Sequence, residues 1–128
     1  MLLPSRRSRL AMAAVFMLTA AGCGGGAPTG DIDKIQVTIT PFEVIVTNTA
    51  GRALFEVKVE IMPVGPATHF TTNVPRMENG ERRNLSHTLF TDRDGVPFSP
   101  RNVKVGGVVV TAKDIDGKEL KVEVPWKQ

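Results

Sequence analysis

The residues of this 128-residue chain that could do chemistry are few, and their spacing does not favour catalysis. Ser86 and His87 form the only serine–histidine neighbour pair. Neighbouring residues of a strand point to opposite faces of a sheet, so this pair is not placed to act as nucleophile and base. No Gly-x-Ser-x-Gly turn exposes a serine elsewhere. His87 alternates in step with Leu85 and Leu89, which predicts a half-buried histidine with its hydrogen bonds satisfied, on the core face of a strand or at its margin.

Residues that could hold a metal are also sparse. His69 and His87 are the only histidines, and Cys23 is the only cysteine. Asp92-Arg-Asp-Gly95 and Asp114-Ile-Asp-Gly117 resemble the start of a calcium loop, but neither continues to the glutamate that completes such a loop. Asp-Gly is also a favoured hairpin dipeptide, so we interpret both segments as turns at opposite ends of the fold and predict a two-residue hairpin turn at Asp116-Gly117. We therefore expect no metal, no cofactor and no enzymatic activity.

A signal-like segment stands at the start of the chain. Arg6, Arg7 and Arg9 precede a largely apolar run of 12 residues, from Leu10 to Ala21. The run is too short for a helix that needs about 20 residues to cross a bilayer. Its order of charge, apolar core and small residues is typical of a secretory signal. The rest of the chain holds thirteen basic and thirteen acidic residues, so the pI of 9.4 gives no support to a nucleic-acid partner.

The end of that segment, Ala20-Ala21-Gly22-Cys23, resembles the lipobox of bacterial lipoproteins. The resemblance implies a signal peptide over residues 1–22, a lipid on Cys23 and a protein anchored in the bacterial cell envelope. In a Gram-negative cell, Gly24 after the cysteine resembles outer-membrane sorting, to the periplasmic face or the surface. Ala20 stands where that family most often has Leu. Cleavage by an ordinary signal peptidase, giving a soluble secreted protein, is therefore the alternative.

The remaining chain has the pattern of a tether followed by one small β-domain. Residues 23–33 are rich in glycine, which predicts a tether, and residues 34–128 then form the domain. From residue 35 the apolar residues recur with a period of two, as in half-buried strands, and no amphipathic helical stretch follows residue 23. Pro41 is compatible with one bent strand or with two, and the Gly106-Gly107 pair suggests a bulge or a close backbone approach in a later strand. The expected strands cover residues 35–39, 42–47, 55–61, 68–74, 84–89, 103–113 and 120–126.

Six or seven short strands with frequent turns predict an all-β fold, an antiparallel sandwich of immunoglobulin or fibronectin-III type. The cysteine pair and the mid-chain tryptophan of a true immunoglobulin domain are missing. The segments Val46-Thr-Asn-Thr-Ala-Gly51, Phe55-Glu-Val-Lys-Val and Asn79-Gly80-Glu81 resemble the small FxLYD-type sandwich domains of bacterial surface proteins. Those domains share no catalytic residues, so the resemblance implies no active site.

The segment from residue 92 to residue 102 is the candidate interaction loop, because it is long for a hairpin connection. Its candidate contact residues are Asp92, Asp94, Val96 and Phe98. The alternative is that Phe98 folds back to plug the end of the sandwich, with Val96 packed beside it.

The sequence as a whole predicts a lipid-anchored, non-catalytic interaction or assembly module for another envelope protein. A small-ligand or carbohydrate-binding module is the alternative, although the chain has no tyrosine and a single tryptophan, Trp126.

Overall fold

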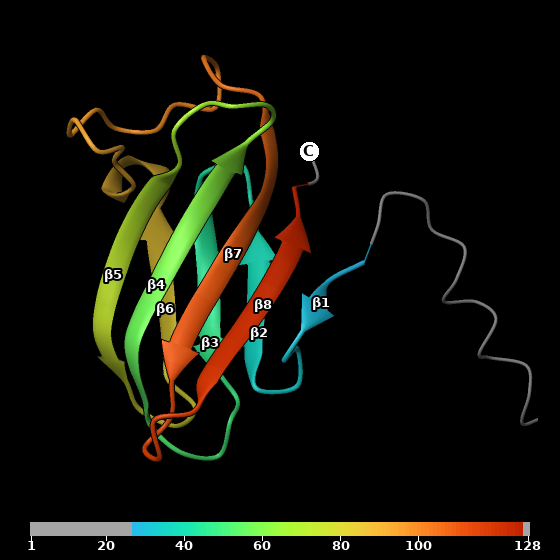
Figure 1. Ribbon diagram of the computed structural model, residues 1–128, viewed down its shortest axis with the longest axis vertical. Coiled ribbons are helices and arrows are strands. Elements are labelled where there is room, and N and C mark those ends of the chain that lie inside the picture. Colours follow the sequence, from blue (N-terminus) through green and yellow to red (C-terminus); the bar gives the residue numbers. More distant parts are fainter. Residues whose placement is uncertain (1–26, 127–128) are drawn as a thin grey trace, which may run out of the picture.

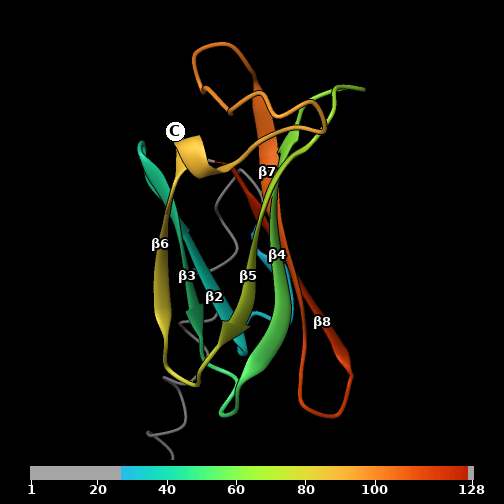
Figure 2. The same ribbon diagram turned by 90° about the vertical axis from the view of Figure 1, so that its left-hand side faces the viewer.

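The computed structural model describes residues 27–126, which form a sandwich of two antiparallel β-sheets, one of five strands and one of three. The two sheets lie face to face in Figures 1 and 2. This confirms the predicted all-β sandwich. A short 3-10 turn, η2 (His87–Leu89), is the only helical element of these residues. The strands are β1 (Thr29–Gly30), β2 (Ile35–Ile39), β3 (Glu43–Asn48), β4 (Leu54–Pro63), β5 (Phe70–Met77), β6 (Arg82–Ser86), β7 (Val105–Lys113) and β8 (Glu119–Pro125).

The strand order is β1-β8-β7-β4-β5 in the larger sheet and β2-β3-β6 in the smaller one. Successive side chains of a strand point to opposite faces, so alternate residues of both sheets meet in one core. The largest fully buried side chains of this core are those of Ile35, Val44, Val46, Leu54, Val57, Val59, Ile61, Met77, Phe90, Val108, Val110 and Leu120.

The two ends of the sandwich carry different connections. The apical end, at the top of Figure 1, carries the β2–β3 turn, the β4–β5 loop and the segment 87–104. The basal end carries the turn before β2, the β3–β4 and β5–β6 turns and the β7–β8 hairpin. The candidate loop 92–102 therefore lies at the apical end, and the two Asp-x-Asp-Gly turns lie at opposite ends as predicted.

Two strands, and not one bent strand, flank Pro41. Strands β2 and β3 pair in antiparallel register along their whole length. In the turn between them, the backbone N–H and the hydroxyl of Thr40 donate to the carbonyl of Glu43, and the hydroxyl accepts the N–H of Phe42. None of these hydrogen bonds involves the nitrogen of Pro41, so this turn tolerates a proline.

Strand β4 departs from the predicted alternation at its start. Phe55 is predicted to face the core, but it is only half-buried and Leu54 is buried instead. The φ of Glu56 is +52°, and the pairing of β4 with β7 shifts its register between Phe55 and Lys58. A β-bulge at this point inserts one residue, which exchanges the faces of the residues before it. The Phe55 ring lies outside, 5.2 Å from the guanidinium carbon of Arg76.

Strand β6 ends earlier than the sequence predicts. The alternation of Leu85, His87 and Leu89 predicts a strand through residue 89, whereas β6 stops at Ser86 and η2 follows. The Ser86 hydroxyl accepts the backbone N–H of Thr88 and thereby caps η2. Because η2 turns the chain, Leu89 is exposed, while Leu85 is buried as predicted. His87 differs from its prediction: it is 5% exposed and not half-buried, it lies in η2 and not in a strand, and its Nε2 has no hydrogen-bond partner among the described residues.

The Gly106-Gly107 pair in β7 meets both expectations for glycines within a strand. The register between β4 and β7 is irregular beside Gly106, as at a bulge. A Cβ added to Gly107 would lie 2.9 Å from a backbone oxygen of β8, so the two strands approach closely there.

The domain begins earlier than the predicted tether allows. The tether is predicted over residues 23–33, yet β1 pairs with β8. The N–H of Asp31 donates to the carbonyl of Lys121, and its carboxylate accepts the N–H of Lys121. Gly30 has a φ of +96°, and an added Cβ would collide with the Lys121 carbonyl. This glycine is therefore required by a turn and a close backbone contact, and not by tether flexibility.

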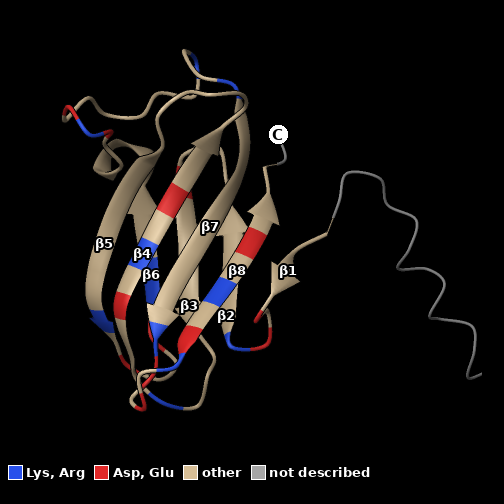
Figure 3. Ribbon diagram, viewed as in Figure 1, with Lys and Arg blue, Asp and Glu red and all other residues tan. Residues whose placement is uncertain are grey.

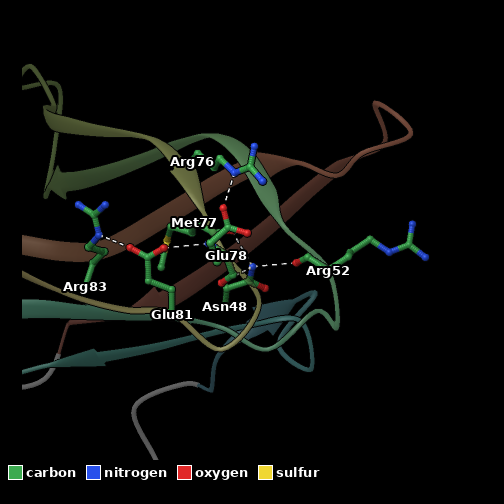
Figure 4. Close-up of polar contacts among 7 residues, drawn as sticks. All are labelled: Asn48, Arg52, Arg76, Met77, Glu78, Glu81 and Arg83. Atoms are coloured by element: carbon green, nitrogen blue, oxygen red, sulfur yellow. Dashed lines mark hydrogen bonds and ion pairs between the residues drawn. The ribbon is translucent and has the colours of Figure 1, made fainter.

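A buried asparagine, Asn48, joins the two sheets at the basal end (Figure 4). It is the last residue of β3, and its amide donates to the carbonyls of Arg52, Met77 and Glu78 at 2.8, 3.0 and 3.1 Å. Its Oδ1 accepts the N–H of Ala50 at 2.9 Å. Because Asn48 ends β3 and Met77 ends β5 in the opposite sheet, this side chain links the two sheets. The sequence predicts only a turn here.

Candidate functional site

The four candidate residues of the 92–102 loop are divided between interior and surface. Phe98 is 3% exposed and lies in the core, whereas Val96 is 53% exposed. Phe98 therefore plugs the end of the sandwich, and Val96 does not pack beside it. Asp94 is exposed, and Asp92 is half-buried because its carboxylate accepts backbone N–H groups of the loop. Among the four candidate residues, Val96 is the exposed apolar one.

Phe98 holds the apical end together through a cluster of aromatic rings. Its ring centroid lies 5.3 Å from that of Phe70, 5.5 Å from that of His87 and 6.0 Å from that of Trp126. His87 is 5% exposed, and within the described residues neither its Nε2 nor the Nε1 of Trp126 has a hydrogen-bond partner. Burial lowers the pKa of His87, an effect that the Glu43 carboxylate opposes. The imidazole is therefore uncharged at neutral pH and packs as one more ring of the cluster.

The two Asp-x-Asp-Gly segments form the same hairpin loop. In each, the N–H of the first aspartate donates to the carbonyl four residues later, and its Oδ1 accepts the N–H groups two and four residues later. Gly95 and Gly117 follow with φ of +83° and +82°. The loop after Asp114 thus has three residues, 115–117, and the two-residue turn suggested by Asp-Gly is wrong. The backbone N–H of Lys118 lowers the pKa of Asp114, so this carboxylate acts as a turn cap.

The serine and histidine candidates form no hydrogen-bonded pair in the described chain. Ser86 is exposed and its hydroxyl bonds with Thr88, whereas His87 is buried in the 3-10 turn that follows. The Nδ1 of His69 lies 2.9 Å from the carboxylate of Glu60, in an exposed pair that does not include His87. Within residues 27–126 no group of three or more His, Cys, Asp or Glu side chains is placed to hold a metal ion.

Of the four strand edges in the described part of the chain, only that of β2 lacks a feature that discourages pairing. Proteins protect edges with short strands, charges, prolines or bulges. Strand β1 has two residues, β5 contains Pro75 and is bridged by Thr91, and β6 begins with Arg82 and Arg83. Strand β2 reads Ile-Gln-Val-Thr-Ile and pairs with β3 without a bulge. It therefore presents an uncharged, regular edge to another strand.

Alternate residues of β2 direct their backbone groups toward this edge. Hydrogen bonds of 2.9 Å join Lys34 and Thr40, on either side of β2, to β3 and the residue after it. In an antiparallel pair every second residue bonds to the partner strand, so the even-numbered residues of β2 face β3. The N–H and C=O groups of Val37 and Ile39 therefore point away from β3, where no other described strand pairs with β2.

An apolar groove runs along the same edge, between the two sheets, and we call it the edge groove. It consists of two adjoining hollows of about 260 and 240 Å³. Val37, Ile39 and Val124 are half-buried at its margin, where they pack against the core. The walls contain no charged side chain. They are formed by Pro28, Ile32, Ile35, Gln36, Val37, Thr38, Ile39, Val122, Val124 and Pro125.

Sequence reasoning did not single out the edge groove. The available signal was the composition of residues 35–39, which contain no charge, glycine or proline. Whether such a strand lies at an edge or at the centre of a sheet depends on the pairing of the other strands, which its own residues do not encode.

Cys23 lies outside the described residues, so its lipidation stays a prediction. Within residues 27–126 no helix has the length and apolar character needed to span a membrane. No protein-family model matches the chain, and neither a curated protein nor a solved structure does. The resemblances to bacterial lipoproteins and to FxLYD domains therefore depend on the motifs quoted above.

Proposed function

We propose that this protein is a lipid-anchored component of the bacterial cell envelope whose sandwich binds an extended segment of another envelope protein. The observation that carries the proposal is the edge groove, in which an uncharged edge strand borders apolar hollows. A strand added beside β2 would bond to the backbone of Val37 and Ile39. Binding of this kind draws its affinity from main-chain hydrogen bonds and its specificity from alternate side chains.

The walls of the groove define the chemistry of the segment that fits it. Every second side chain of an added strand points toward the groove, and uncharged walls favour apolar side chains there. Pro28 stands in the wall only five residues after Cys23. A lipid on Cys23 would therefore keep the groove next to the membrane, where an envelope partner is found.

The other functions have less support. Ser86, His87 and His69 form no catalytic pair. A carbohydrate-binding module usually presents an exposed aromatic platform, whereas the ring of Trp126 lies 5.5 Å from that of His87 within the apical cluster.

The anchor is tested by fractionation of cells that produce the full-length chain. We expect the wild type in the membrane fraction and Cys23→Ala in the soluble fraction. Wild-type protein in the soluble fraction would instead support the secreted alternative.

The groove is tested by a photo-crosslinking residue at Gln36, combined with proline substitutions at two edges. Val37→Pro removes an N–H that points away from β3. The matched control, Asn84→Pro, removes the equivalent N–H at the β6 edge. Backbone hydrogen bonds join Glu81 and His87, on either side of β6, to Asn48 and Phe42. Alternate residues of β6, Asn84 among them, therefore direct their N–H groups away from β3. Trp126 emission reports whether each variant is folded.

We expect a crosslinked partner in the wild type and in Asn84→Pro, and its loss in Val37→Pro. Equal crosslinking in folded Val37→Pro would show that the partner does not add to β2. A product of twice the mass of the chain would identify a second copy in place of a different protein.

A further inference from the structure

The described chain enters the domain on its apical half. Strand β1 pairs with β8 so that Thr29 lies opposite Glu123, two residues before the apical end of β8. Ala27 lines a hollow with Gly106, Gly107 and Pro125, close to the same end. Cys23 is four residues before Ala27, and four residues span at most about 14 Å. A lipid on Cys23 would therefore hold the apical half of the domain near the bilayer.

Exposed apolar side chains are concentrated at the apical end as well. Six large apolar side chains of the described residues are exposed, and four of them stand in apical connections. Phe42, in the β2–β3 turn, is the most exposed at 79%. The other three are Val64 in the β4–β5 loop, Leu89 in η2 and Val96 in the candidate loop. Ile32 and Ile115 are the two that lie at the basal end.

Charge does not separate the two ends (Figure 3). The basal turns 31–34, 49–53, 78–81 and 114–118 are acidic, but Arg76, Arg82, Arg83 and Lys113 stand at the strand ends beside them. Arg76 pairs with Glu78 and Arg83 with Glu81. The orientation therefore depends on the chain entry and the apolar side chains alone.

We infer that the apical end rests on the lipid surface that holds Cys23, with Phe42 and Val96 at the headgroup level and the basal end directed away from the membrane. The inference depends on the proposed lipid anchor. It is carried by two separate observations: the place where the chain enters and the apolar apical side chains. An aromatic ring at the headgroup level is favourable because that region is apolar on one side and wet on the other.

The test places one reactive thiol at a time in the full-length, membrane-anchored protein. In a lipidated chain Cys23 is blocked, so a new cysteine is the only free thiol. Phe42→Cys and Val96→Cys report on the apical end, and Ile115→Cys, also exposed, is the matched basal control. Each is labelled with an environment-sensitive fluorophore in vesicles of phosphatidylethanolamine and phosphatidylglycerol that contain a quencher-bearing lipid. Trp126 emission confirms folding, and the second apical position covers the case in which one apical variant does not fold.

We expect a blue shift and lipid quenching of the apical probes and neither effect at residue 115. Stronger quenching at residue 115, or quenching at none of the positions, would overturn the orientation. An apical probe that is shielded from water but not quenched by lipid would indicate a protein at the apical end, which also overturns the inference. Wild-type protein that is not membrane-bound refutes the anchor, whereas membrane-bound protein with an unquenched apical probe refutes only the orientation.

Discussion

Replacing Asn48 by alanine should destabilise this domain strongly, because the buried amide joins its two sheets. Four hydrogen bonds are lost together, three donated by the amide and one accepted by Oδ1. Each hydrogen bond contributes about 1 kcal/mol net, and a buried carbonyl left without a partner costs about 1–3 kcal/mol. The amide has two hydrogens for three carbonyls, so we expect a loss of about 2–4 kcal/mol in the free energy of unfolding. For a domain of this size the melting temperature then falls by roughly 10–20 °C.

Urea denaturation of the purified full-length chain, followed by the emission of its single tryptophan, measures this loss. The matched control is Asn79→Ala, which removes one exposed hydrogen bond from the Gly51 N–H and should cost less than about 1 kcal/mol. If Asn48→Ala costs no more than this control, the amide does not hold the sheets together.

An aspartate at the same position adds a pH dependence with a defined sign. In Asn48→Asp, an ionised carboxylate would face three carbonyl oxygens with no hydrogen to donate, so its pKa in the folded state rises above that of the unfolded chain. Stability relative to wild type should therefore be highest below about pH 4 and fall as the pH rises through that value. An Asn48→Asp variant whose stability relative to wild type does not change between pH 4 and pH 7 would contradict the burial of this side chain.

Three further changes test the apical cluster and the start of the domain. Phe98→Ala should cost about 3–5 kcal/mol in chemical denaturation because the ring is buried, whereas Val96→Ala should change stability by less than about 0.5 kcal/mol; equal effects would contradict the plug. Burial lowers the pKa of His87 from 6.5, so the unfolded chain binds the proton at a higher pH than the folded chain does. The wild type should therefore lose stability as the pH falls below 6.5, and His87→Gln should lack this loss. A variant whose stability has the same pH profile as the wild type would refute the role of His87. Gly30→Ala should lower the free energy of unfolding by about 1 kcal/mol more than Gly51→Ala does. Both glycines have positive φ, but only Gly30 lies against a carbonyl. Equal melting temperatures of the two variants would show that β1 contributes little to stability.

The elements that the sequence predicts correctly are those in which local pattern and burial agree. Strand β3 around Val44 alternates without interruption, as does β4 from Val57 to Ile61, and both are found. The prediction fails where one residue breaks the register. Glu56 carries no sequence mark of a left-handed residue, since glutamate rarely adopts that conformation, so the bulge that turns Phe55 outward is not predictable from pattern alone.

The contacts that depend on strands far apart in the chain are less predictable still. Asn48 has the inward parity of Val44 and Val46, which was a usable sign that its amide is buried, but two of its acceptors lie about 30 residues away, at and just after the end of a strand in the other sheet. The sequence predicts Gly30 as part of a tether because the residues around it do not show that β8 pairs beside it. The edge groove has the same origin, because it arises from the order of the strands and not from any motif.

Strand β1 links the anchor, the groove and the orientation of the domain. The pairing of β1 with β8 shortens the span between Cys23 and the domain. Strand β1 also extends the larger sheet past β2, so that Pro28 forms part of the groove wall. A two-residue strand holds few hydrogen bonds and depends on the close fit at Gly30. Its release would lengthen the tether and open one wall of the groove at the same time. Gly30→Ala should therefore weaken partner crosslinking at Gln36 and apical quenching together, while Gly51→Ala changes neither; loss of one without the other would show that anchor and groove are not joined through β1.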